Sequence, residues 1–154
     1  MPRRPTALTG AAGEHFVAYR LSGMGYSVAL TRGGSPTVDL LVASEKGGSA
    51  LSIQVKTSDW AFRSHKRKPE QNHWEWDVGK KALTLKAESL LYVFVDLKWD
   101  DHKAVLPDTF IVPSADVAAF LGPDWSRYMF WIMEVDRSKY HDAWHLITDG
   151  LVNR

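Results

Sequence analysis

The chain has no cysteine among its 154 residues, which excludes disulfide bonds and thiolate chemistry. Its formal net charge is only +1, so the overall charge does not indicate a nucleic-acid partner, and any basic surface must be local. No apolar run approaches the ~20 residues that a membrane helix needs. The basic N-terminus is not followed by the apolar segment of a signal peptide. We therefore expect a cytoplasmic protein without membrane contact.

The chain does contain enough apolar residues for a sizeable core. Hydrophobic residues make up 45% of the sequence and aromatic residues 12%, including seven tryptophans. Such a composition argues against global disorder. The length is typical of one domain, so residues 1–154 are interpreted as a single domain.

The order of local patterns predicts an α/β domain with a central mixed β-sheet flanked by helices. Residues 58–81 are polar and charged with interleaved tryptophans, and they are interpreted as a basic and aromatic loop insertion. The predicted helices and strands follow from apolar periodicity and from the positions of glycine and proline. The helices cover 9–24, 114–121 and 138–147, and the strands cover 26–31, 38–43, 51–56, 90–97, 109–112 and 128–135.

A turn rich in glycine joins the predicted strands 38–43 and 51–56 into a hairpin. Residues equidistant from the turn lie side by side in an antiparallel pair. If the turn is centred on Gly47, Asp39 lies opposite Val55 and close to Gln54 and Lys56. A slip or bulge of one residue would align the three polar side chains.

These residue types suit the hydrolysis of a phosphodiester with the help of a divalent metal. Mg²⁺ binds oxygen ligands and needs only one or two protein carboxylates, because it keeps several waters. Asp39 is the expected metal ligand, with the Gln54 side chain and the Val55 backbone carbonyl as further oxygen donors. Lys56 would stabilise negative charge or orient the attacking water.

Glu14 is a second candidate, because it is aligned with an apolar stripe of the first predicted helix. Its neighbours three, four and seven residues on are Val17, Ala18 and Leu21. A carboxylate among them needs a partner, because burying an unpaired charge is costly. A metal ion, a water molecule or Lys56 would serve. The alternative is a Glu14 that reaches solvent and an ordinary Asp39–Lys56 ion pair worth about 0.2–1 kcal/mol.

Glu14, Asp39 and Gln54-Val-Lys56 together resemble the PD-(D/E)xK nuclease superfamily, and Pro36 precedes Asp39 slightly early for the motif. The Gln-x-Lys form is similar to that of Mrr-type restriction endonucleases, and the layout to that of archaeal Holliday-junction resolvases. The resemblance covers residues 10–58. It implies a restriction-endonuclease-like three-layer fold and hydrolysis of DNA with Mg²⁺ or Mn²⁺. It also implies that the enzyme could be a homodimer.

Gln54 departs from the superfamily pattern, which usually has aspartate or glutamate at this position. The site therefore has one negative charge fewer, and its metal affinity should be lower. The alternative hypothesis is a catalytically inactive module that kept the fold and binds DNA or protein.

A basic cluster follows the candidate site in the sequence. Basic residues neutralise backbone phosphates, and aromatic rings stack on exposed bases. The cluster is predicted to contact DNA, although a solvated mobile loop is an equally good interpretation. Its members are Trp60, Arg63, Lys66, Arg67 and Lys68.

Overall fold

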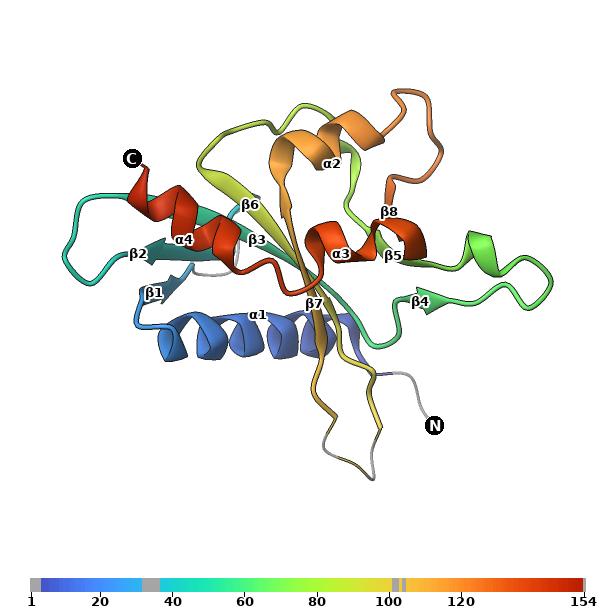
Figure 1. Ribbon diagram of the computed structural model, residues 1–154, viewed down its shortest axis with the longest axis horizontal. Helices are drawn as coiled ribbons and strands as arrows, with labels where there is room; N and C mark the ends of the chain where they lie inside the picture. The colour runs from blue at the N-terminus through green and yellow to red at the C-terminus, as the bar shows by residue number, and fades with distance from the viewer. Residues whose placement is uncertain (1–3, 32–36, 101–102, 104, 154) are drawn as a thin grey trace.

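The computed structural model describes residues 4–31, 37–100, 103 and 105–153. These residues form a five-stranded sheet, a separate three-stranded sheet and helices packed around them (Figure 1). The helical elements are α1 (Thr6–Gly23), η1 (Pro69–Gln71), η2 (Lys80–Leu83), α2 (Ser114–Phe120), η3 (Glu134–Asp136), α3 (Arg137–Tyr140) and α4 (His145–Val152), where η denotes a 3₁₀ turn. The strands are β1 (Ser27–Leu30), β2 (Leu40–Ala43), β3 (Ala50–Ser58), β4 (Phe62–Arg63), β5 (His73–Asp77), β6 (Leu90–Asp96), β7 (Asp108–Pro113) and β8 (Met129–Met133).

The five-stranded sheet has the order β1-β2-β3-β6-β7. Its β3–β6 pair is parallel and the other neighbours are antiparallel. This arrangement confirms the predicted central mixed sheet flanked by helices. The central strand β6 is buried at every position from Leu90 to Asp96, as expected for a strand covered on both faces.

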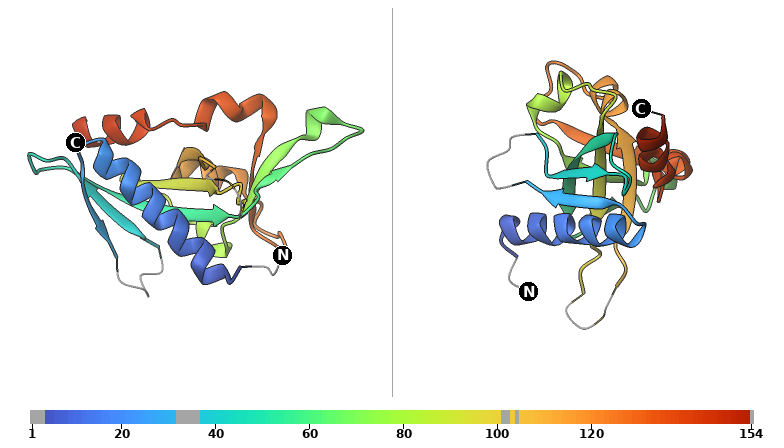
Figure 2. Two further views of the ribbon diagram at one scale, coloured as in Figure 1. Left: turned by 90° about the horizontal axis from the view of Figure 1, so that it is seen from below. Right: turned by 90° about the vertical axis from the view of Figure 1, so that its left-hand side faces the viewer.

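One face of this sheet forms an aliphatic core under α1 and α4. Val17 and Leu21 of α1 and Ile147 of α4 are fully buried against strand residues such as Ile53 and Val93. Burial of each such side chain contributes about 1.5–3 kcal/mol. Figure 2 shows α1 crossing this face of the strands at an angle. Helix α1 is thereby fixed directly over the β2–β3 hairpin.

The other face forms an aromatic core under the β4-β5-β8 sheet and α2. Phe94 stacks on Phe130 with ring centroids 4.9 Å apart, and Trp76 contacts Phe94 at 5.0 Å. The Trp76 indole N–H donates a hydrogen bond to the Val95 carbonyl at 3.0 Å. The buried aromatic groups therefore join the second sheet to the first.

The prediction of a loop over residues 58–81 is wrong. This stretch contains the end of β3, the whole of β4, η1 and β5, and the start of η2. Trp74 and Trp76 of β5 are buried in the aromatic core, and β5 pairs with β8 more than fifty residues later. The alternation of tryptophans with polar residues was the pattern of a strand with one buried face.

The single predicted helix over 138–147 is also wrong, because α3 and α4 are separate. Asp142 between them takes a positive φ of 50°, which interrupts a right-handed helix. Its backbone N–H donates to the Thr109 carbonyl at 2.9 Å, and its carboxylate accepts from the Thr109 hydroxyl. Contacts with β7 therefore break the helix at this point.

The other predicted elements are confirmed to within a few residues of their boundaries. Pro36, like the rest of the segment 32–36 and the first three residues, lies outside the described residues. Among the helices of the described residues, none is both long and apolar enough to cross a membrane.

Candidate functional site

The site is built on the β2–β3 hairpin, whose turn uses two glycines with positive φ. Gly47 and Gly48 have φ values of 71° and 99°, which glycine adopts without a steric penalty. Leu40 pairs with Ile53, so the register is shifted by one residue from the pairing centred on Gly47. Asp39 follows immediately beyond this last pair. The shift is the one-residue slip that the sequence left open.

Asp39 closes the hairpin with its side chain. Its backbone N–H donates to the Ile53 carbonyl at 2.9 Å, so Ile53 faces both Leu40 and Asp39, as in a β-bulge. Its Oδ2 atom accepts the Val55 backbone N–H at 2.7 Å. The carboxylate is therefore held at Val55, between Gln54 and Lys56 in the sequence.

The environment of Asp39 disfavours its charge. Partial burial raises the pKa of Asp39 above its usual value, and the Val55 hydrogen bond and the Lys56 charge offset this only in part. No ion pair between Asp39 and Lys56 within 4.0 Å exists among the described residues. The simple cross-strand ion pair is thus not formed, and no described residue donates a hydrogen bond to the other carboxylate oxygen, Oδ1.

Gly13 sets the position of α1 over the hairpin. A Cβ atom on Gly13 would lie 1.8 Å from the Thr57 hydroxyl oxygen, so only glycine allows this close approach. Gly13 belongs to the buried stripe of α1 together with Thr9, Val17 and Leu21. The adjacent residue, Glu14, consequently sits at the edge of the helix–sheet contact and is only partly buried.

Glu14 lies within electrostatic range of Asp39. Desolvation raises the pKa of Glu14, and the Asp39 charge raises it further, while His15 lowers it. No ion pair between Glu14 and Lys56 within 4.0 Å is present in the described part of the chain, although the sequence suggested Lys56 as the partner. Two carboxyl groups with raised pKa values thus lie near each other, and neither forms an ion pair with a lysine or arginine of the described residues.

Gln54 and Lys56 lie on the face of the sheet that is turned away from α1. In the parallel β3–β6 pair they are level with Tyr92 and Phe94, whose rings belong to the aromatic core. Both side chains line a cleft of about 310 Å³. Asp39 immediately precedes β2, and both Glu14 and Lys56 are close enough to affect its charge or to be affected by it.

Tyr92 is a member of the site that no sequence pattern indicated. Its side chain lines the same cleft as Gln54 and Lys56. Burial, with the Asp39 charge as a smaller contribution, raises the pKa of Tyr92 to about 12. The tyrosine is therefore a neutral hydrogen-bond donor at neutral pH. Tyr92 lies beside Gln54 in the parallel β3–β6 pair, and this neighbour could be identified only from the strand pairing in the structure.

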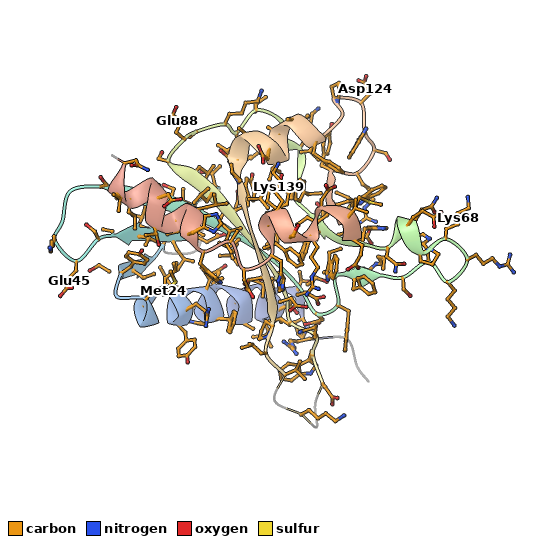
Figure 3. The ribbon with its side chains drawn as sticks, in the orientation of Figure 1. Met24, Glu45, Lys68, Glu88, Asp124 and Lys139 are labelled. Atoms are coloured by element: carbon orange, nitrogen blue, oxygen red, sulfur yellow. The ribbon has the colours of Figure 1, made fainter. Side chains whose placement is uncertain are left out.

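The predicted basic cluster lies apart from this cleft on the arm formed by β4, η1 and β5, which projects from one end of the molecule (Figure 3, Lys68). Arg63 is bound within the arm, because its Nε atom lies 2.7 Å from the Glu75 carboxylate. Lys66, Arg67, Lys68 and Trp60 are exposed. Of the cluster, these four residues remain open to an external partner.

No protein-family model and no curated protein matches the sequence. A solved structure, that of the bacterial homing endonuclease I-Ssp6803I, matches with a TM-score of 0.60 and 20% sequence identity. The match covers 97% of this chain and 96% of the homing endonuclease. The chain shares the fold of that endonuclease.

Proposed function

We infer that the chain is a metal-dependent endonuclease that hydrolyses DNA phosphodiester bonds, with a PD-(D/E)xK site of the Gln-x-Lys form. The observation that carries this inference is the placement of Asp39 at Val55, beside Lys56 and within electrostatic range of Glu14. The full-length likeness in fold to a homing endonuclease supports it. The likeness also supports DNA as the substrate.

The oxygen donors around Asp39 fit a hard divalent cation. The raised pKa values of Asp39 and Glu14 reflect carboxylates that a cation would stabilise in their charged form. Asp39 and Gln54 would bind Mg²⁺ or Mn²⁺, with the Val55 backbone carbonyl and Glu14 completing the set directly or through water. When bound, the metal would lower the pKa of a water ligand and neutralise charge on the phosphate.

Residues of the protein would stabilise charge on the phosphate and hold the reacting groups in place. Lys56 supplies a positive charge for the non-bridging oxygens of the phosphate, whose negative charge grows as the nucleophile adds. Tyr92 can donate a hydrogen bond from its neutral hydroxyl group into the same cleft. The Val55 N–H holds the Asp39 carboxylate in one orientation, so little reorganisation is required when substrate binds.

A second candidate function is a catalytically inactive module that binds DNA or protein. Gln54 favours it, because an amide binds a divalent cation more weakly than a carboxylate does. The described residues also contain no group of three or more aspartate, glutamate or histidine side chains placed to hold a metal. Activity therefore depends on whether two carboxylates and an amide suffice.

Cleavage of supercoiled plasmid DNA in Mg²⁺ or Mn²⁺ tests the enzyme directly. We expect nicked or linear product with the wild type and none with Asp39→Ala or Lys56→Ala. Lys46→Ala and Asp124→Asn are matched controls, because both residues are exposed and lie outside the cleft lining. They should cleave like the wild type. Equal product from the wild type and Asp39→Ala would reject the nuclease and leave the inactive module.

The proposal includes a homodimer, because a two-fold symmetric enzyme can present one site to each strand of a duplex. Exposed tryptophans support an association surface: Trp131 is 41% exposed and Trp125 38% exposed. Sedimentation equilibrium of the free protein and of its DNA complex would measure the stoichiometry. A protein that stays monomeric in both samples would exclude the dimer.

A further inference from the structure

The cleft beside the candidate site has a second basic wall that the sequence did not suggest. Lys80 and Lys81 of η2 line the cleft together with Lys56 and Gln54 of β3. Tyr92 of β6 also lines the cleft. Two segments far apart in the sequence thus place three lysines around one hollow of about 310 Å³.

The turn that carries Lys80 and Lys81 is fixed to the body of the protein. Gly79 enters the turn with a positive φ of 75°, which allows the chain to reverse direction after β5. The Asp77 carboxylate accepts the Gly79 backbone N–H at 3.1 Å. Ala82, at the next turn position, is 1% exposed within the aromatic core. The two lysines are therefore presented from a rigid support.

No acidic side chain in the described part of the chain forms an ion pair with Lys80 or Lys81. Both lysine side chains are exposed. Asp77, the nearest acidic residue in the sequence, pairs instead with Arg127 at 3.6 Å. A concave, uncompensated positive surface attracts a polyanion, and lysine binds phosphate as a point charge.

We propose that Lys80 and Lys81 bind the backbone phosphates that flank the cleavage position, so that the DNA strand runs through the cleft between β3 and η2. The proposal rests on the proposed endonuclease function. In this arrangement Lys80 and Lys81 are positioning residues, since they hold the strand while Lys56 faces the phosphate that is cut. The exposed arm around Lys66 and Lys68 is then not required to place that phosphate.

The experiment measures binding of a short fluorescent DNA duplex of mixed sequence, without divalent metal, over a range of salt concentrations. Each phosphate contact contributes about 0.9 to the slope of log affinity against log salt. The double variant Lys80→Gln/Lys81→Gln should therefore lose about 1.8 from the slope of the wild type. Its affinity should be weaker by about 10²-fold at about 50 mM salt, and the difference should shrink about tenfold as salt rises to about 200 mM.

Two other double variants remove the same net charge elsewhere. Lys46→Gln/Lys103→Gln changes exposed residues outside the cleft lining, and its slope should match that of the wild type. Lys66→Gln/Lys68→Gln tests whether the arm contributes phosphate contacts to the salt slope. The proposal is overturned if the cleft variant keeps the wild-type slope, or loses no more slope than Lys46→Gln/Lys103→Gln. It is also overturned if the wild-type duplex complex does not form.

Plasmid cleavage by the same proteins separates this proposal from the proposed function. With saturating metal, Lys80→Gln/Lys81→Gln should raise KM and leave kcat nearly unchanged, as expected for residues that bind the ground state and the transition state equally. If the wild type cleaves and the cleft variant has the wild-type KM, the lysine proposal alone fails. If the wild type binds through these lysines but does not cleave, the endonuclease function alone fails.

Discussion

Two antiparallel hairpins extend toward opposite ends of the molecule, and they differ in whether their charged side chains form ion pairs. Figure 3 shows the tip of the β2–β3 hairpin at Glu45 and the tip of the β4–β5 arm at Lys68, at the two ends of the long axis. In the arm, Arg63 and Glu75 neutralise each other at 2.7 Å. In the β2–β3 hairpin, Asp39 lies partly buried without an ion pair to a described residue. The contrast shows which charges are available to a ligand.

The pKa values express the same difference. Burial raises the pKa of Asp39, and burial together with Asp39 raises the pKa of Glu14. The fold thus holds two carboxylates where their charged forms are less stable than in water, which is common at functional sites. A bound cation would stabilise the charged form of both carboxylates.

The largest effect expected from this contrast is the loss of cleavage on Asp39→Asn. Removing a charged group that acts on the transition state typically costs about 10²–10³-fold in kcat. The amide oxygen can still accept the Val55 N–H, so the hairpin should remain folded. Cleavage of plasmid DNA under saturating Mg²⁺ measures the loss, and thermal unfolding confirms the fold.

Glu75→Gln is the matched change in the arm, since it also neutralises one carboxylate. It removes the partner of Arg63 and should leave kcat unchanged. A comparable loss of activity in both variants would show that the two hairpins do not differ in the way the charges suggest.

The central hairpin was predictable because its signals are local. Two glycines, the alternation of Leu51, Ile53 and Val55, and the spacing of Asp39 from Lys56 specify strands, turn and approximate register. The second sheet was not predictable in the same way, because β5 finds its partner β8 across more than fifty residues. The alternation of its tryptophans with polar residues is the pattern of a strand, but this pattern does not identify β8 as the partner.

The same distinction applies to the candidate site. Asp39 and Lys56 are neighbours through one hairpin, whereas Lys80 and Tyr92 reach the cleft through a tertiary crossover. Nothing in the sequence around Lys80 distinguishes it from Lys66 or Lys68. The exposed run from Lys66 to Lys68 indicated a DNA contact because its basic residues are consecutive in the sequence. The fold instead places Lys80 and Lys81 in the cleft beside the hairpin.

The second largest effect is expected from Gly13→Ala, which tests whether the hairpin depends on close contact with α1. The new methyl group would overlap the Thr57 hydroxyl, 1.8 Å away. Such overpacking costs about 1–3 kcal/mol of unfolding free energy, and the displaced helix would carry Glu14 away from Asp39. Chemical denaturation and cleavage assays should both show a loss.

Gly10→Ala is the control for this change, because Gly10 lies in the same helix and its added Cβ would meet no atom within 4 Å beyond the adjacent residues and the helix's own backbone. It should stabilise the protein by up to about 1 kcal/mol through helix propensity. Stabilisation by Gly13→Ala as well would mean that α1 is not held closely against Thr57.

A third and smaller effect concerns the coupling of metal binding to pH. In metal-free protein, the pKa of Asp39 is higher in the folded state than its ordinary value of 3.8. At pH values between these two pKa values, the folded state therefore binds more protons than the unfolded state. The unfolding free energy contributed by this group therefore falls as pH rises through that interval. Relative to the wild type, Asp39→Asn should gain unfolding free energy at neutral pH, and this gain should vanish below pH 3.8.

Mg²⁺ should reverse that relation at neutral pH by stabilising the charged carboxylates. At about ten times its Kd it adds about 1.4 kcal/mol to the unfolding free energy, or about 3–6 °C in Tm. The increase should be smaller at acidic pH, where protons compete for Asp39 and Glu14, and absent in Asp39→Asn. Thermal scans with and without Mg²⁺ measure it. An equal increase in the wild type and Asp39→Asn would place the metal elsewhere.

The smallest effect is expected from Arg63→Gln in the arm. Arg63 is 44% exposed and its partner Glu75 is 23% exposed, and pairs this accessible contribute about 0.2–1 kcal/mol. Its Nη1 atom also donates to the Trp60 carbonyl at 2.8 Å, so the variant should loosen the start of the arm without unfolding the protein. We expect an unchanged kcat and a fall in Tm of at most about 2–4 °C. A large fall in kcat at unchanged Tm would instead give Arg63 a role in catalysis, and the functional contrast between the two hairpins would not hold.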